Sequence, residues 1–396
     1  MSFSWQTLAS QKPILSLSPM DGMTDFAFRQ IHALKGKPDL CFTEFTHVEG
    51  MWHGSPELLH NFLYHKAQHP IIAQIYGKKP EYFYKAALMV CAMGFDGVDI
   101  NMGCPAKNVT HSGGGAALIG TPELAKEIIR AVQKAVQDWA NGITLEEIGL
   151  PQNKIEKIKF IHDFSTNPIV LNLQTLQGSF KDDPLRQTFD CRSGASMRDS
   201  AMRVGVKLPK VSLERAPIPV SVKTRLGITE PQTEEWISHL LEMNIANITL
   251  HGRTLKQMYA GQADYHELSK AAALVTKTNT TFMINGDINS RTDALEKISH
   301  TKSHGALIGR AALGNPWVWQ PAHQYTPIHR LQDALEHAHL FAIVNPNPKQ
   351  YVQMRKHFNY YIRDFAYANE IKVELVRSST YSESKQIIEN ALSKIT

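Results

Sequence analysis

The sequence predicts an α/β protein built on a (β/α)8 (TIM) barrel. Eight short apolar runs, rich in β-branched residues, recur along the chain, and each ends in a polar or glycine-containing loop. The runs are continuous rather than alternating, as expected for parallel strands that are covered on both faces. Most of them are followed by a helical pattern, and eight strand–helix steps are typical of a closed barrel.

The predicted strands are Ile14–Ser18, Leu40–Thr43, Ile71–Ile75, Gly97–Asn101, Val220–Thr224, Asn247–Leu250, Thr281–Asn285 and Gly305–Ile308. The predicted helices include Glu81–Met93, Pro122–Val136, Thr233–Met243 and Thr292–His300. Thr121 and Ser290 stand where helix N-caps are expected, and a proline follows Thr121 at the first helical position. A doubly wound open sheet is the alternative fold, but no G-x-G-x-x-G motif follows the first strand.

Two regions interrupt the strand–helix alternation. Residues 141–216 form an insertion between the fourth helix and the fifth strand, far longer than such a connection needs. The tail is helical in pattern without a strand signal, and His357, Tyr361, Asp364 and Phe365 share one face at helical spacing. The predicted parts are a first half-barrel (1–140), the insertion (141–216), a second half-barrel (217–325) and a C-terminal helical-bundle domain (326–396).

The composition is that of an ordinary globular protein with a mild basic excess. Lysine and arginine number 42 against 37 acidic residues, a net charge of +5 that permits a polyanionic partner without requiring one. The four cysteines form no C-x-x-C pair and no cluster with zinc spacing, so we expect no metal site. Neither a signal-peptide profile nor an apolar run of about 18 residues is present, and we expect a monomeric cytoplasmic protein with free thiols and no membrane segment.

The stretch from Gly97 to Lys107, GVDINMGCPAK, predicts a buried strand that ends in a polar loop. This loop offers the thiol of Cys104, the carboxamide of Asn101 and the cation of Lys107. Glycines at 113–115 follow and would let a flat ligand approach the backbone closely. A thiol at the carboxyl end of a strand indicates chemistry, whereas thiols inside apolar elements, such as Cys41 and Cys91, are expected to pack.

Polar residues at the other strand ends are the remaining candidates, because the βα loops form the active face of a barrel. They are Pro19, Met20, Asp21, Glu44, Gln74, Lys223, Arg225, His251, Arg253, Asn285, Gly286, Asp287, Gly309 and Arg310. The loops after strands seven and eight commonly hold a phosphate, so we expect Gly286, Gly309 and Arg310 to cradle the phosphate of a cofactor. Of the two basic residues on the fifth strand, we expect only Lys223, and not Arg225, to face the barrel mouth.

Nine motifs in these same regions resemble those of one enzyme family. They are SPMDGMTDFAFR, TEF, AQIYG, GVDINMGCPAKNV, GGGAA, SVKTRLG, TLHGRT, INGDI and GRAALGNPW, in this order. Together they resemble the tRNA-dihydrouridine synthases over most of residues 14–137 and 218–325, with weaker similarity at 354–365. The resemblance implies a barrel that carries FMN, NADPH as reductant, and a C-terminal helical domain that helps to bind tRNA.

The resemblance also assigns roles to individual positions. The implied flavin contacts are Pro19, Met20, Asp21, Gln74, Lys223 and His251, and the implied holders of the phosphate end are Asn285, Gly286, Asp287, Gly309 and Arg310. Asn101 would hydrogen-bond the uracil, and Lys107 and Arg253 would stabilise charge that develops on it. Cys104 would donate a proton, which suits a thiol that is mostly protonated at neutral pH.

Other functions stay open at this point. A flavin barrel could reduce a free pyrimidine or an enone, a dihydrouridine synthase could act on ribosomal RNA, and a barrel without catalysis could only bind RNA. The second half of the insertion is basic and could be a solvated appendage or a further RNA or partner surface. From residue 191 on, its charged residues are Arg192, Arg198, Arg203, Lys207, Lys210 and Arg215 against Asp199 and Glu214.

Overall fold

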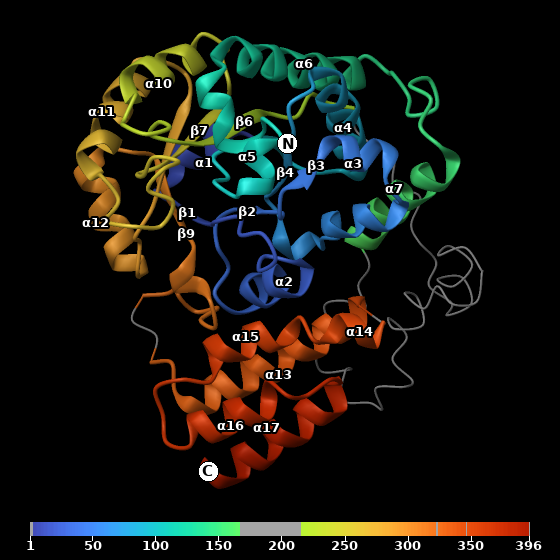
Figure 1. Ribbon diagram of the computed structural model, residues 1–396, viewed down its shortest axis with the longest axis vertical. Helices are drawn as coiled ribbons and strands as arrows, with labels where there is room; N and C mark the ends of the chain where they lie inside the picture. Colours follow the sequence, from blue (N-terminus) through green and yellow to red (C-terminus); the bar gives the residue numbers. More distant parts are fainter. Residues whose placement is uncertain (1–2, 167–214, 322–323, 346, 396) are drawn as a thin grey trace.

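The computed structural model describes residues 3–166, 215–321, 324–345 and 347–395, and it shows a parallel barrel with a helical domain beside it (Figure 1). The strand order is β1-β9-β8-β7-β6-β5-β4-β2, and β3 also pairs with β4. The strands are β1 (Ile14–Leu17), β2 (Cys41–Phe42), β3 (Thr46–His47), β4 (Ile71–Tyr76), β5 (Gly97–Met102), β6 (Val220–Arg225), β7 (Asn247–His251), β8 (Thr281–Asn285) and β9 (Gly305–Ile308).

The barrel closes between β1 and the start of β2. Ser16 and Leu40 form a parallel bridge, and the Leu17 amide donates to the Leu40 carbonyl over 3.1 Å. All the strand pairs are parallel, which confirms the predicted (β/α)8 barrel. A single second strand, Leu40–Thr43, was predicted, but the structure has two short strands here. Both β2 and β3 pair with β4, and Glu44 lies between them.

Helices surround the barrel in the predicted order (Figure 1). The described ones in the barrel region are α1 (Trp5–Gln11), α2 (Phe26–Lys35), α3 (Val48–His53), α4 (Pro80–Met93), α5 (Lys107–His111), α6 (Pro122–Ala140), α7 (Gln152–Ser165), α10 (Thr233–Leu241), α11 (Tyr265–Val275) and α12 (Arg291–Thr301), with 3-10 turns η1 (Pro56–Phe62), η2 (Lys66–Gln68), η3 (Gly115–Gly120) and η8 (Arg310–Ala312). Ser290 caps α12 as predicted, since its hydroxyl accepts from the Asp293 amide at 3.0 Å. Thr121 makes no such bond, and α6 starts with Pro122 at its first turn.

The inner face of the barrel carries polar residues at matching heights on neighbouring strands. Gln74, Asp99 and Ser221 are in register across β4, β5 and β6. Higher up, Asn101 is in register with Lys223. Side chains alternate between the two faces of a strand, so residues two apart share a face and these layers stack toward the carboxyl ends of the strands.

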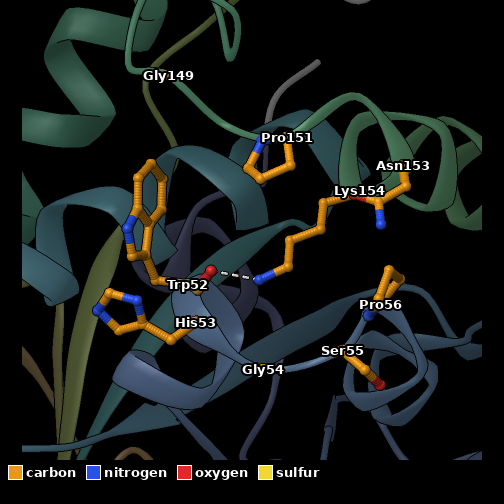
Figure 2. A pocket seen from close by; sticks show the side chains of 9 residues that line it. All are labelled: Trp52, His53, Gly54, Ser55, Pro56, Gly149, Pro151, Asn153 and Lys154. Carbon is orange, nitrogen blue, oxygen red and sulfur yellow. Dashed lines mark hydrogen bonds between the residues drawn. The ribbon is translucent and has the colours of Figure 1, made fainter.

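The first part of the insertion is packed against the barrel and is not a solvated appendage. Helix α7 contacts α4 and η1, and it buries Ile155, Ile158, Ile161 and Phe164 in the main hydrophobic core. The Lys154 ammonium, almost fully buried, donates to the Met51 carbonyl at 2.8 Å and to that of Trp52 at the end of α3 (Figure 2). Arg215 donates to the Ile143 carbonyl, and the other basic residues named for the second half of the insertion, from Arg192 to Lys210, lie outside the described residues.

The C-terminal helices form a second core that packs on the barrel through α2 (Figure 1). They are α13 (Pro327–Val344), α14 (Pro348–Tyr351), α15 (Met354–Tyr361), α16 (Ala368–Leu375) and α17 (Tyr381–Ile395). The predicted helical face ends earlier than expected. His357 and Tyr361 are buried on α15, but Asp364 lies beyond the helix at a φ of 65°, so it and Phe365 do not continue that face.

Polar contacts of Lys35 and Trp317 join this domain to the barrel, and a third contact, between Trp319 and His32, lies on the barrel side of the interface. Lys35 on α2 donates to Glu336 on α13 at 2.9 Å, and the Trp317 indole donates to Asp333 at 2.9 Å. The Trp319 indole donates to the Nδ1 of His32 at 3.0 Å, within a cluster that includes Phe28. The interface is therefore both apolar and hydrogen-bonded, and it holds the helical domain at one side of the barrel.

Replacing Lys154 with alanine should lower the free energy of unfolding by about 2 kcal/mol, because two buried carbonyls lose a charged donor. Chemical denaturation of the purified variant measures this loss. Lys159→Ala is the matched control, since its side chain is 63% exposed on the same helix and its loss should change stability by less than about 0.5 kcal/mol. Equal stability of Lys154→Ala and the parent would contradict the role of Lys154 in docking the insertion.

Candidate active site

The loop that carries Cys104 is held in place by one side chain. Cys104 lies half-buried just after β5, and the Oδ1 of Asn101 accepts from the backbone amides of Gly103 at 3.1 Å and Cys104 at 2.8 Å. The turn is local, because an asparagine two or three residues upstream offers the backbone an acceptor at the right distance. The carboxamide of Asn101 therefore positions the thiol.

A buried chain of hydrogen bonds extends from Asn101 down into the barrel. The Nδ2 of Asn101 donates to Gln74 at 2.9 Å, and the Nε2 of Gln74 donates to Asp99 at 2.7 Å. The Ser221 hydroxyl donates to the other oxygen of Asp99 at 2.6 Å. Burial raises the pKa of Asp99 to about 6, against the opposing effect of these donors and of Lys223. At neutral pH the carboxylate is charged and orients both amides.

The glycines after the thiol loop serve protein packing. A Cβ on Gly114 would lie 2.9 Å from the Gly77 carbonyl oxygen, and one on Gly115 would lie 2.8 Å from that of Cys104. Gly115 also has a φ of +58°, which other residues rarely adopt. The glycine backbone thus approaches the loops after β4 and β5 closely, where a ligand was expected. This contact holds the thiol loop in place.

Lys223 and Arg225 both face the barrel mouth, so the expectation that only Lys223 does is wrong. Residues two apart on a strand lie on the same face, which the expectation overlooked. The Lys223 ammonium donates to Asn285 at 3.0 Å. The Arg225 guanidinium donates to the carbonyls of Gly103 at 2.7 Å, Thr254 at 3.1 Å and Met258 at 2.9 Å, and so ties the thiol loop to the loop after β7.

The loops after β7, β8 and β9 meet around one carboxylate. Asp287 accepts from Arg253 at 2.7 Å, from Arg310 at 2.7 Å and from the Ala263 amide at 2.8 Å. Burial by itself would raise the pKa of the Asp287 carboxyl. The two arginines outweigh this effect and hold the pKa below its usual value. Arg253 is buried with its guanidinium on Asp287, so it belongs to this group of loops and not to the thiol loop.

Two donors in this group have no partner among the described residues. They are the Nδ1 of His251 and the Nη1 of Arg253, and both atoms are buried. The backbone beside them has no side chain at Gly286, which has a φ of +121°. A Cβ at this position would lie 2.8 Å from the Cβ of Ala263. Buried donors without acceptors cost free energy, so this arrangement fits an anionic group that accepts from them.

The titration of the site follows from burial. Burial raises the pKa of the Cys104 thiol above its ordinary value, with Asp21 adding to the shift and Arg225 opposing it. Burial and the charge of Arg225 lower the pKa of Lys223 to about 8, and burial with four neighbouring cations lowers that of His251 well below its usual value. Near pH 7 the site therefore holds a protonated thiol, a charged lysine and a neutral imidazole.

The loop after β1 forms the remaining wall. The loop follows Pro19, and the Met20 amide donates to the Thr24 hydroxyl at 3.0 Å. The sulfur of Met20 lies 3.5 Å from the position that a Cβ on Gly309 would take, so this loop meets the loop after β9. Asp21 is exposed, and the charge of Lys356 on α15 partly offsets the rise in its pKa that burial causes. The ammonium of Lys356 lies 3.6 Å from the position of a Cβ on Gly22, so the helical domain reaches the mouth here. Lys107 is exposed at the start of α5.

Sequence reasoning missed two residues of this site. Asp99 had a signal, a single carboxylate inside an otherwise apolar strand, but its role depends on Gln74 and Ser221 from other strands. Lys356 had none, because its distance from Gly22 depends on how the helical domain packs. Within the described ranges, no three His, Cys, Asp or Glu side chains are placed to hold a metal ion, and no helix is long and apolar enough to cross a membrane.

A separate pocket of about 500 Å³ lies at the edge of the barrel, between α3 and the start of α7 (Figure 2). Its lining includes Trp52, Ser55, Pro151 and Lys154 and none of the predicted site residues. Lys154 spans it to reach the Trp52 carbonyl. The pocket therefore belongs to the docking of the insertion and not to the barrel mouth.

A thiol loop that Asn101 and Arg225 hold at the carboxyl ends of the strands is the arrangement expected of an enzyme of the (β/α)8 class, and sequence comparison gives the family. The family described as dihydrouridine synthase (Dus) matches residues 16–160 and 202–396. The chain belongs to this family, which confirms the predicted family and the predicted class of enzyme, an oxidoreductase.

Two bacterial relatives match along nearly their whole length. The chain is 28% identical over 387 residues to a "Probable tRNA-dihydrouridine synthase" of Staphylococcus aureus strain Mu50, covering 96% of this chain and 93% of the relative. It is 26% identical over 393 residues to "Probable tRNA-dihydrouridine synthase 2" of Bacillus subtilis strain 168, covering 98% and 95%.

Solved structures resemble this one only distantly. An old yellow enzyme homologue of Zymomonas mobilis gives a TM-score of 0.36 at 12% identity, covering 77% of this chain and 86% of the other. A dihydroorotate dehydrogenase (DHODH) of Eimeria tenella gives 0.36 at 11% identity, covering 76% and 62%. The fold assignment rests on the strand pairing of the barrel itself.

Cys104 should be alkylated by iodoacetamide in the native protein, at a rate that still rises above pH 9, because burial keeps its thiol protonated. Cys41 and Cys91 are buried, with pKa values raised to about 12, and should react only after unfolding. Mass spectrometry of the peptides, in a Cys191→Ser background, distinguishes the sites. A Cys104 rate that levels off below pH 8 would contradict the expected titration.

Proposed function

We propose that this protein reduces the 5,6-double bond of uridine in tRNA, with FMN in the barrel mouth, NADPH as reductant and Cys104 as proton donor. The names of its relatives from Staphylococcus aureus and Bacillus subtilis support tRNA as the substrate. The observation that carries the proposal is a half-buried thiol, whose pKa burial raises, on a loop at a barrel mouth where buried nitrogen atoms of Arg253 and His251 have no partner among the described residues. A cytoplasmic location follows from the proposed substrate, and the monomeric state stays a prediction.

The donor set supports FMN in particular. Arg253, Arg310 and His251 would hold its phosphate, with Gly286 and Gly309 leaving room, and Asp287 would orient the two arginines. Asn285 would act partly through Lys223, whose ammonium it holds. Gln74, together with Pro19, Met20 and Asp21, would line the flavin ring. Bound reduced FMN would supply the hydride that adds to carbon 6 of uracil.

The residues of the thiol loop would complete the reaction. Cys104 would give its proton to carbon 5, and the thiolate that remains would be stabilised by Arg225 and Lys223, whose charges favour it. Asn101 would hold the thiol through the two amides that it accepts from, and the N–H of its carboxamide that does not meet Gln74 would hydrogen-bond the base. Lys107 would contact the RNA at the rim. The uridine must leave its stack to reach this site.

Affinity for FMN should weaken as the pH rises above about 8. An anion held beside Lys223 favours the charged form of this lysine, so the pKa of Lys223 rises when the anion binds. The pKa of Lys223 in the unliganded protein is lowered to about 8. Affinity is therefore full below this pKa and falls above it. Fluorescence titration of the apoprotein from neutral pH to about pH 10 measures the change. Lys223→Gln should bind more weakly with a flat profile, and a parent profile that is flat over this range would refute the assignment.

Cys104→Ala should keep the flavin spectrum and its bleaching by NADPH but lose uridine reduction by about 100-fold or more, because the acid is gone. Cys91→Ala, a buried thiol in α4, is the control and should keep full turnover. Each variant is expressed in a strain that lacks the parent gene, and dihydrouridine is mapped in the RNA of that strain. The mapped positions identify the RNA that the protein modifies. Modification of ribosomal RNA, or turnover of a free pyrimidine instead of tRNA, would replace the proposed substrate.

A further inference from the structure

The last residue of β4, Tyr76, faces the inside of the barrel mouth. Ile72 on the same strand packs in one apolar cluster with Leu307 of β9, a strand that is not a neighbour of β4, so Ile72 points into the barrel. Side chains alternate along a strand, and Gln74 therefore points inward as well, where it accepts from Asn101 at 2.9 Å. Tyr76 is the next member of this inner row and lies one layer above Gln74, with its side chain half-buried.

The height of Tyr76 in the barrel is that of the carboxamide beside the thiol loop. Ile75 is in register with Ile100 of β5, so the next pair toward the mouth is Tyr76 and Asn101. Asn101 accepts from the Cys104 amide at 2.8 Å. The phenol therefore stands on the strand next to the thiol loop, at the level where Asn101 would meet the base.

The loop that follows Tyr76 is packed against the thiol loop through two glycines. A Cβ on Gly114 would lie 2.9 Å from the Gly77 carbonyl oxygen. A Cβ on Gly115 would lie 2.8 Å from the Cys104 carbonyl oxygen and 3.2 Å from the Cys104 Cβ. Backbone contacts without intervening side chains thus connect the end of β4 to the thiol, and they fix the position of Tyr76 relative to it.

The ring of Tyr76 is held by two aromatic neighbours, while its hydroxyl group is unused. Phe45 meets it edge-on at 5.0 Å between ring centroids, and His47, in register with it on β3, lies at 5.0 Å as well. The hydroxyl makes no hydrogen bond with any residue that the structure describes, whereas that of Tyr82 on α4 meets His53 at 2.8 Å. A fixed phenol with a spare O–H at a barrel mouth can donate to a ligand.

Tyr76 is a donor and not a base at neutral pH. Burial raises the pKa of its phenol above the ordinary value, and the negative charges of Asp21 and of a Cys104 thiolate raise it further. The phenol therefore stays protonated throughout the range in which the site works.

We propose that Tyr76 donates a hydrogen bond to the 4-carbonyl oxygen of the flipped uracil and stabilises the negative charge that develops there during reduction. The proposal rests on uridine reduction as the proposed function and adds a catalytic residue to it. Carbon 5, which takes the proton of Cys104, is bonded to carbon 4. The edge of the base nearest the thiol loop therefore carries the 4-carbonyl, beside Tyr76.

The balance of the step shows why a donor is useful at this oxygen. Hydride addition to carbon 6 moves the electron pair of the 5,6-double bond to carbon 5 and, by conjugation, onto the 4-carbonyl oxygen. The proton of Cys104 then bonds to carbon 5, so the ring is reduced, the flavin is oxidised, and Tyr76 keeps its own proton. A donor directed at charge that appears only during the reaction stabilises the transition state more than the bound substrate.

The test is a single turnover without oxygen, in which a tRNA transcript reoxidises the reduced, flavin-loaded protein and the flavin absorbance is followed. Tyr76→Phe removes only the hydroxyl and should slow this step by about 10-fold to 100-fold. The affinity for tRNA, measured by filter binding, should change by less than about threefold, because the hydrogen bond strengthens in the transition state. The rate of flavin reduction by NADPH should equal that of the parent.

Tyr82→Phe is the matched control, because Tyr82 directs its hydroxyl to His53 on α3 and away from the mouth. It should leave the turnover rate, the affinity and the NADPH reaction unchanged, and both variants should match the parent in circular dichroism and flavin content. An unchanged turnover rate in Tyr76→Phe would overturn the proposal. An equal loss in tRNA affinity or in the NADPH reaction would also overturn it, in favour of a structural role. A parent protein whose reduced flavin tRNA does not reoxidise would instead defeat the proposed function.

Discussion

The structure of the barrel mouth depends on one buried carboxylate, Asp99. Its two oxygens accept from Ser221 and Gln74, so it connects β5 to both neighbouring strands below the site. Gln74 is thereby oriented to accept from Asn101, and Asn101 in turn accepts from the backbone of the thiol loop. Because a buried charge is tolerated only when it is fully hydrogen-bonded, this chain allows one arrangement of the loop around Cys104.

The second constraint is the excess of positive charge above that chain. Burial lowers the pKa of His251, and the charges of Lys223, Arg225, Arg253 and Arg310 lower it further, which keeps the imidazole neutral. Asp287 binds two of these arginines, and Arg225 donates to three carbonyls, whereas one buried nitrogen each of Arg253 and His251 has no partner among the described residues. The charges of Arg225 and Lys223 favour a thiolate at Cys104, whereas burial has the larger effect and raises the pKa of the thiol.

The helical domain takes part in this site through its packing. Its helix α13 lies on α2, whose chain continues from the loop after β1, and Lys35, Trp317 and Trp319 hold the interface. Lys356 reaches the loop that carries Asp21 as a result. The orientation of this domain therefore bears on both the flavin side of the mouth and the path open to an RNA strand.

The sequence by itself determined the order of strands and helices, because continuous apolar runs and capped helical patterns are local features. It also determined that Gln74, Asn101, Lys223, His251 and Asn285 converge, since the carboxyl ends of parallel strands meet at one face of a barrel. The prediction that Arg225 does not face the barrel mouth was wrong for a local reason. Residues two apart on a strand lie on the same face, so Arg225 faces the same way as Lys223. These conclusions need no knowledge of contacts between distant segments.

Tertiary structure decided the remaining features. Asp99 meets Ser221 across 122 residues of sequence, and Lys154 of the insertion meets Met51 in α3 across 103. Arg253 meets Asp287 and the loops around it only when the chain has folded. Such pairings depend on how elements pack, and side-chain spacing along a sequence holds no information about a partner that another element supplies.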